Sequence, residues 1–315
     1  MSRRSPIKTI HSHCHHLGWD NSHAPTARIE PGSTLELQCL DAGNGHFRPD
    51  STADTVRSLA ADRANPLTGP VFVDGAEPGD ILAVTLDSFA PSGFGWTAII
   101  PGFGLLADQF SRPALQLWSY DREVQAPAAF GTYARIPLRP FAGTLGVAPA
   151  APGNHSVIPP RRVGGNLDTR DLCAGSTLYL PVEVAGALFS IGDTHAAQGD
   201  GEVCGTAIES AMNVTVKLDL IKQTPLAMPR FSTAGPVTRH IDGAGYDVFT
   251  GVGPDLLQAA RDAVSGAIDW LTATQRVPAE QAYMLCSVCG DLRVTEIVDL
   301  PNVVVAFYMP RMVFD

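Results

Sequence analysis

Residues 192–205, GDTHAAQGDGEVCG, concentrate ionisable side chains in a chain of which only 17% is charged. They follow the apolar run GALFSI. If that run is a strand, Asp193 and His195 point to the same face, because successive side chains alternate. A carboxylate beside an imidazole can bind a divalent metal, or can orient a general base. The glycines allow tight turns that would return Asp200 and Glu202 to the same point; the alternative is a solvated turn whose acids cap the next segment.

The segment HSHCHHLGWDN, residues 11–21, holds four of the nine histidines. In an extended chain His11, His13 and His15 lie on one face and His16 lies on the other. Such a strip can bind zinc, and it can equally form a solvated edge strand in which no histidine has a special role.

Two further motifs offer weaker signals. In RVGGNLDTRDL, residues 162–172, two glycines precede Asn166 and Asp168 and permit close backbone approach to a ligand. An ordinary Asx turn explains the same pattern. The single C-x-x-C pair of Cys286 and Cys289 cannot complete a four-ligand zinc site.

The elements that must position these side chains are mostly strands. Glu-Pro-Gly turns precede alternating apolar residues in 29–42 and again in 76–88, and a third turn and strand within 172–192 lead into the acidic stretch. The clearest helix is predicted over 254–276, and a second begins near Pro278. The end of the chain alternates again and predicts two strands. We therefore expect a mainly β (α+β) fold, with sandwich or barrel-like sheets and a few helices in the C-terminal third.

Length and charge restrict the possible partners. We expect the 315 residues to form one unit, with a possible sub-division at residue 160 into a β-rich N-terminal part and an α+β C-terminal part that carries the acidic motif. The net charge is −10 and only three lysines occur, which disfavours nucleic acid as a partner. No apolar run approaches the roughly 20 residues that span a bilayer. The chain has no apolar core of signal-peptide length at its start, so we expect a cytoplasmic protein with no membrane partner.

The block NLDTRDLCAGSTLYLPVEVAGALFSIGDTHAAQGDGEVCGTAIE resembles the signature of the acetamidase/formamidase family. NPLTGPVFVDGAEPGDIL, IPGFGLLAD, GTLGVAP and DLRVTEIVD resemble further family segments in the same order, so the resemblance covers nearly the whole chain. It implies hydrolysis of small linear amides to a carboxylate and ammonia, a mainly β fold, and a homodimer or homotetramer. The positions that match the family motif are Asp168, Asp193, His195, Gln198, Asp200, Glu202 and Glu209.

The resemblance and the chemistry of amide hydrolysis together suggest a metal centre. Asp193 and His195 are the expected ligands of a divalent metal, with zinc as the expected ion, and His16 is the expected third ligand because HLGW resembles one branch of the family. Glu202 or Asp200 would accept the proton of the attacking water and return it to the leaving nitrogen. Calcium at a separate structural site is a further possibility.

The remaining assignments complete this hypothesis. Asp168 is a third catalytic candidate, and Asn166, Gln198 and Trp19 are candidates for contacts with the amide substrate. Two alternatives stay open: an amidase that uses Cys204 as its nucleophile, and a β protein that binds a small ligand without catalysis.

Two departures from the family pattern bear on these alternatives. Gln38 stands where relatives commonly carry Glu, and His46 lies in a segment where they carry Gly-Gln-Ile. A lost carboxylate at position 38 could remove a ligand or a base, and both departures favour the binding protein.

Overall fold

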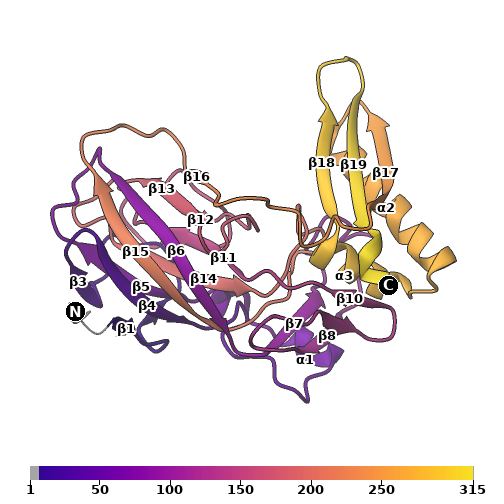
Figure 1. Ribbon diagram of the computed structural model, residues 1–315, viewed down its shortest axis with the longest axis horizontal. Helices are drawn as coiled ribbons and strands as arrows, with labels where there is room; N and C mark the ends of the chain where they lie inside the picture. The colour runs from indigo at the N-terminus through magenta and orange to yellow at the C-terminus, as the bar shows by residue number, and fades with distance from the viewer. Residues whose placement is uncertain (1–6, 315) are drawn as a thin grey trace.

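Two six-stranded sheets form the larger part of the molecule, shown on the left of Figure 1. The computed structural model describes residues 7–314. The first sheet has the order β1 (Lys8–Ile10), β4 (Ser33–Cys39), β15 (Met212–Ile221), β6 (Ile81–Pro91), β13 (Thr177–Pro181), β16 (Arg230–Ser232). The second has the order β12 (Gly164–Asn166), β11 (Phe141–Gly146), β14 (Phe189–His195), β5 (Leu67–Val73), β2 (His15–His16), and β3 (Ala27–Ile29) also pairs with β5. Strands from both sides of residue 160 therefore share both sheets.

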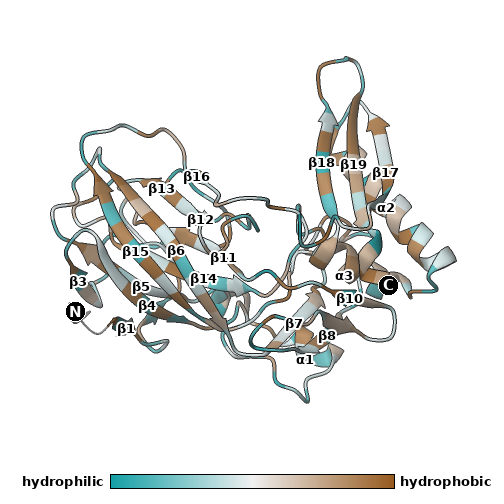
Figure 2. Ribbon diagram, viewed as in Figure 1, coloured by the Kyte–Doolittle hydropathy of each residue, from teal (hydrophilic) through white to brown (hydrophobic). Residues whose placement is uncertain are grey.

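The alternation in the sequence explains how these sheets pack. Along β4, Leu35 and Leu37 are buried between partly exposed neighbours, and along β6 Val84 is buried between the partly exposed Ala83 and Thr85. These side chains join residues of the second sheet, such as Ile191, in one core. Figure 2 shows brown apolar residues along β6 and β15. The two strands that follow Glu-Pro-Gly, β4 and β6, both pair antiparallel with β15 and lie on either side of it.

The strand β14 is buried along its whole length. It lies between β11 and β5 in the second sheet, so the apolar run before the acidic motif is paired along both edges. The predicted strand that leads into the motif is therefore confirmed.

The C-terminal part stands upright on the right of Figure 1. It contains a three-stranded antiparallel sheet of order β17 (Tyr246–Gly253), β19 (Val303–Pro310), β18 (Asp291–Glu296). Helix α2 (Leu256–Thr274) packs on β17 and β19, and α3 (Ala279–Cys289) packs against α2. The side chain of Asp255 caps α2 by accepting a hydrogen bond from the Gln258 amide. The mainly β fold and both predicted helices are confirmed.

A smaller region connects the two parts. It contains the hairpin of β7 (Phe94–Ile99) and β8 (Ala114–Ser119), the hairpin of β9 (Ala128–Phe130) and β10 (Ala134–Ile136), and two short helices, α1 (Ala53–Arg57) and the 3-10 helix Ala61–Arg63. A second 3-10 helix, Arg311–Phe314, ends the described chain. None of the helices in the described residues is long and apolar enough to cross a membrane.

Candidate active site

The end of β14 places Asp193 and His195 side by side. His195 Nε2 lies 3.2 Å from Asp193 Oδ1, and both side chains are buried. The backbone of Asp193 is left-handed, with φ +53°, a conformation that a residue other than glycine adopts rarely. The predicted proximity of these two side chains is confirmed.

Three more carboxylates meet at the same imidazole. An isolated antiparallel bridge pairs Glu209 with His195, and Glu209 Oε2 lies 3.0 Å from His195 Nε2. The ligand atoms of Asp168, Asp193 and His195 all lie within 4.8 Å of one another, and so do those of His195, Glu202 and Glu209. The two groups share His195, so four acids surround one buried imidazole.

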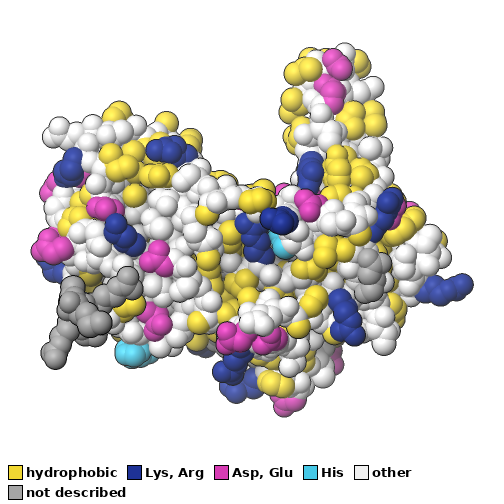
Figure 3. Space-filling view, viewed as in Figure 1, with side chains coloured by type: hydrophobic (Ala, Val, Ile, Leu, Met, Phe, Trp, Pro, Cys, Tyr) yellow, Lys and Arg dark blue, Asp and Glu magenta, His cyan; other side chains and the backbone are white. Residues whose placement is uncertain are grey.

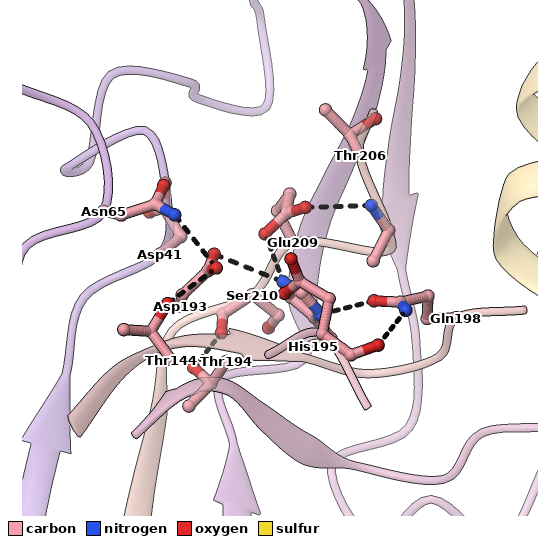
Figure 4. A network of polar contacts seen from close by, with 12 residues as sticks. Asp41, Asn65, Thr144, Asp193, Thr194, His195, Gln198, Thr206, Glu209 and Ser210 are labelled. Carbon is pink, nitrogen blue, oxygen red and sulfur yellow. Dashed lines mark hydrogen bonds and ion pairs between the residues drawn. The ribbon is translucent and has the colours of Figure 1, made fainter. Parts of the chain in front are cut away.

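Neutral side chains hold Asp193 from its other side, as Figure 4 shows. The Asn65 amide donates to Asp193 Oδ2 at 3.0 Å, and the Thr144 hydroxyl lies 3.2 Å from the same oxygen. Asn166 accepts from Thr144 at 2.6 Å and donates to Asp168 Oδ2 at 2.6 Å. The carboxylates are therefore fixed by residues that come from three separate segments.

Gln198 determines which nitrogen of His195 carries the proton. Its Nε2 donates to the carbonyl oxygen of Asp168 at 2.7 Å, and that oxygen can only accept. Gln198 Oε1 therefore faces His195 Nδ1, at 3.0 Å, and accepts a hydrogen bond from it. In the neutral imidazole this leaves the lone pair on Nε2, which points at the carboxylates, and such a nitrogen is suited to bind a metal.

Crowding and burial shift the acid strengths of the cluster. Burial and the adjacent Asp193 raise the pKa of Asp168 to about 7. Burial and the Asp168 charge raise the pKa of Glu202 well above its usual range. Burial lowers the pKa of His195, but the charges of Glu209 and Asp193 outweigh it and raise that pKa well above 6.5. So many acids around one imidazole are stabilised best by a further positive charge.

The donor set fits a divalent metal such as zinc. Among the described residues Asp168 Oδ1 is buried and has no hydrogen-bond partner, and Glu209 Oε2 has only the His195 imidazole at ion-pair distance. Carboxylate oxygen and imidazole nitrogen are ordinary zinc ligands. Apart from these two overlapping groups, residues 7–314 hold no other set of three His, Cys, Asp or Glu side chains whose ligand atoms lie this close together. The separate calcium site stays a prediction.

A cavity of about 190 Å³ opens beside the cluster. Its polar lining is formed by Asn65, Asn166, Asp168, Asp193, Glu202, Thr206 and Glu209. Trp96, Phe103, Gly205 and aliphatic side chains form the rest. A small molecule in this cavity lies against the carboxylates. Gln38 and His46 are absent from the lining. Both departures from the family pattern therefore lie outside the cavity.

The structure does not bring every expected residue to this place. Asp200 is 44% exposed and lies 3.4 Å from the Arg170 guanidinium, away from the cavity lining. His16 Nδ1 donates to the carbonyl oxygen of Gly18, and its Nε2 pairs with Ser190 Oγ at 2.8 Å, so both nitrogens already have partners. Trp19 is buried with Leu67 and Val157 and does not line the cavity.

The Cys204 thiol is poorly placed for attack. It is fully buried among the Ala98 carbonyl and Thr206, and it does not line the cavity. Burial raises the pKa of the thiol to about 11. A reactive thiol needs the opposite shift and access to substrate.

Three residues of the site were not assigned a role from the sequence. Glu209 matched the family motif, but only the bridge to His195 shows why it belongs here. Asn65 carries no signal in the sequence, because its burial and its left-handed backbone (φ +49°) are visible only in the structure. Thr144 lies in a plain apolar strand and carries none either.

Buried carboxylates around one imidazole, beside a small cavity, form an arrangement suited to hydrolytic chemistry. The model of the Acetamidase/Formamidase family matches residues 4–157 and 151–315, so the chain belongs to that family. Membership makes the chain an amidohydrolase.

Three relatives show how far the similarity extends. The chain is 26% identical to formamidase from Methylophilus methylotrophus, over 95% of this chain and 89% of that protein. The structure of acetamidase from Yersinia enterocolitica is 31% identical, with a TM-score of 0.68, over 98% of this chain and 93% of the other. That of gamma lactamase from Delftia acidovorans is 26% identical, with a TM-score of 0.85, over 96% and 90%.

Proposed function

We propose that this protein hydrolyses small linear amides to a carboxylate and ammonia, with the help of a divalent metal, zinc, held in the buried cluster. The observation that carries the proposal is the convergence of Asp168, Asp193 and His195, whose ligand atoms lie within 4.8 Å of one another beside a cavity. The unpartnered Asp168 Oδ1 and the lone pair on His195 Nε2 support a cation at this place.

The metal, when bound, would polarise the amide carbonyl and lower the pKa of water from 15.7 towards about 7. Glu202 lines the cavity, and its carboxylate belongs to the group whose ligand atoms lie within 4.8 Å of those of His195 and Glu209, which supports it as the residue that accepts a proton from the attacking water. It then returns that proton to the amide nitrogen, which leaves as ammonia. Asn65 keeps the Asp193 carboxylate oriented, since its amide donates to Oδ2, and the Thr144 hydroxyl lies against the same oxygen.

Two substitutions separate the roles in this proposal. His195→Ala should lose both metal and turnover, because it removes an expected ligand. Glu202→Gln should keep the metal and lose turnover by about 10²–10⁴-fold, because the amide is similar in size but cannot accept the proton. Asp200→Asn is the matched control, since Asp200 is a carboxylate of the same motif that lies outside the cavity.

The assay is ammonia release from short amides, with zinc measured in the same samples. Full turnover by Glu202→Gln, or a loss in Asp200→Asn as large as that in Glu202→Gln, would remove Glu202 from the mechanism. Turnover that survives removal of all metal would reject the metal centre. A protein that binds amides and releases no ammonia would be the binding protein of the alternative.

A further inference from the structure

The part of the cavity that the proposed chemistry does not use is apolar. Besides the polar residues, its lining consists of Trp96, Phe103, Gly205 and aliphatic side chains that include Leu59, Ile100 and Ile158. Several of these belong to a small core of their own, in which Leu59 and Ile100 pack on Trp96, Ala98 and Phe47. The wall is therefore a built element of the connecting region and is not a chance exposure of single side chains.

The polar groups of this wall are already bonded elsewhere. Trp96 Nε1 donates to Asp41 Oδ1 at 3.1 Å, and the Trp96 ring packs on Phe47 at a centroid distance of 4.2 Å. The Thr206 hydroxyl donates to the Ala98 carbonyl at 2.9 Å. A ligand therefore meets a largely hydrophobic surface on this side.

Phe103 completes the wall because residue 205 is glycine. Gly205 has φ +87°, and a Cβ there would lie 2.5 Å from a Phe103 ring carbon. Any other residue at position 205 would displace the ring. Phe103 and Ile158 are both partly exposed, so they lie where the wall meets solvent.

We propose that this wall is an acyl-binding subsite that makes the enzyme prefer amides with an uncharged aliphatic chain of three or four carbons over formamide and acetamide. The proposal rests on the proposed amide hydrolysis. The cavity of about 190 Å³ equals about six water-sized groups of about 30 Å³ each. The amide group and the attacking water take about four of these places. The two that remain accommodate the ethyl chain of propionamide, and the terminal methyl group of butyramide reaches the opening beside Phe103 and Ile158.

The charges around the cavity decide what kind of chain it accepts. Its lining contains the carboxylates of Asp168, Asp193, Glu202 and Glu209 and, among the described residues, no lysine or arginine. A chain that ends in a carboxylate would be repelled and would lose its hydration against apolar side chains. Succinamate, which carries a carboxylate where butyramide has its methyl group, is therefore excluded.

Burial of each additional methylene of the substrate should raise its binding constant about fourfold. Butyramide has two methylenes more than acetamide, so its kcat/KM should exceed that of acetamide by about tenfold. Longer chains should give no further gain, because their ends reach solvent past Phe103 and Ile158.

The test is the kcat/KM for ammonia release from formamide, acetamide, propionamide, butyramide and succinamate by the wild-type enzyme. A rise to butyramide, with succinamate at least about tenfold below butyramide, is expected. Ile158→Ala, and Leu59→Ala as a second variant, should lower the butyramide-to-acetamide ratio by about threefold or more. Ile221→Ala is the matched control: Ile221 is 38% exposed, against 39% for Ile158, and lies at the end of β15.

A butyramide-to-acetamide ratio at or below one would overturn the subsite while leaving amide hydrolysis intact. If no amide releases ammonia, the proposed function fails, and the subsite is then tested by calorimetric titration with the same amides. Tighter binding of butyramide than of acetamide would support the subsite, and equal binding would overturn it.

Discussion

Replacing Gln198 by leucine tests how the site is held together. The substitution keeps most of the side-chain volume but removes the acceptor for His195 Nδ1 and the donor to the Asp168 carbonyl. Leaving a buried donor such as this imidazole N–H without a partner costs about 1–3 kcal/mol, and losing the second hydrogen bond costs about 1 kcal/mol. We therefore expect a loss of about 2–4 kcal/mol in the free energy of unfolding.

The same change should weaken the proposed metal site. Without Gln198 Oε1 the imidazole is free to carry its proton on Nε2, the nitrogen that faces the carboxylates. Loss of such a supporting hydrogen bond lowers metal affinity or activity by about 10–100-fold. The assays are urea unfolding, zinc titration of metal-free protein, and ammonia release from acetamide.

The control for Gln198→Leu is Gln258→Leu, because Gln258 is an exposed glutamine in the first turn of α2. It should leave zinc affinity and turnover near the wild-type values. If the zinc affinity and kcat/KM of Gln198→Leu lie within about twofold of those of the control, a change of about 0.4 kcal/mol or less, the proposed support of His195 by Gln198 is wrong.

Three further predictions concern pH, the thiol and assembly. Burial lowers the pKa of His16 from 6.5 to about 4, with His23 and His15 nearby. As the pH falls, the unfolded chain therefore binds a proton at His16 before the folded chain does. The contribution of neutral His16 to the free energy of unfolding is complete above pH 6.5, and up to about 3 kcal/mol of it is lost as the pH falls to 4. In urea unfolding at several pH values, His16→Gln should lose less free energy of unfolding between pH 6.5 and 4 than the wild type does. An equal loss in both proteins would contradict this role of His16. Cys204→Ala should retain turnover in its folded fraction, whereas its complete loss would revive the thiol mechanism. Light scattering should give a particle mass of two or more chains. The tip of the hairpin between β18 and β19, residues 297–300, exposes Ile297, Val298 and Leu300, and charged substitutions there should lower the particle mass. A wild-type monomer of 33.3 kDa would reject assembly.

The periodicity of the chain predicts much of this fold. Alternating apolar residues indicate β4 and β6 because each of these strands buries one face against the second sheet. The helix α2 is visible because its buried residues, such as Val264 and Leu271, recur with helical spacing over 19 residues. Helix α1 has five residues and buries only Val56, so it leaves no period to detect.

The candidate site was predictable where its residues are neighbours in sequence. Asp193 and His195 are two positions apart on one strand, so alternation alone brings them together. Asn65 and Thr144 come from distant segments, and only the pairing of their strands and loops with β14 places them beside Asp193.

One expected base, Asp200, and one expected ligand, His16, lie outside the site for reasons that sequence spacing does not reveal. The Asp200 carboxylate lies near Arg170, whose guanidinium also pairs with the buried Asp291. The His16 side chain bonds to Ser190, which lies an odd number of residues from Asp193 along β14 and so faces the other side of the strand.

The most direct test of the central claim is a zinc titration of the metal-free enzyme, followed by ammonia release from a short amide. The account predicts that activity is absent after chelation and rises in proportion to added zinc, up to about one ion per chain, as one site of three or four protein ligands requires. His195→Ala treated in the same way should recover nothing. Full activity in a sample whose measured zinc and other divalent metals are far below one ion per chain would contradict the account.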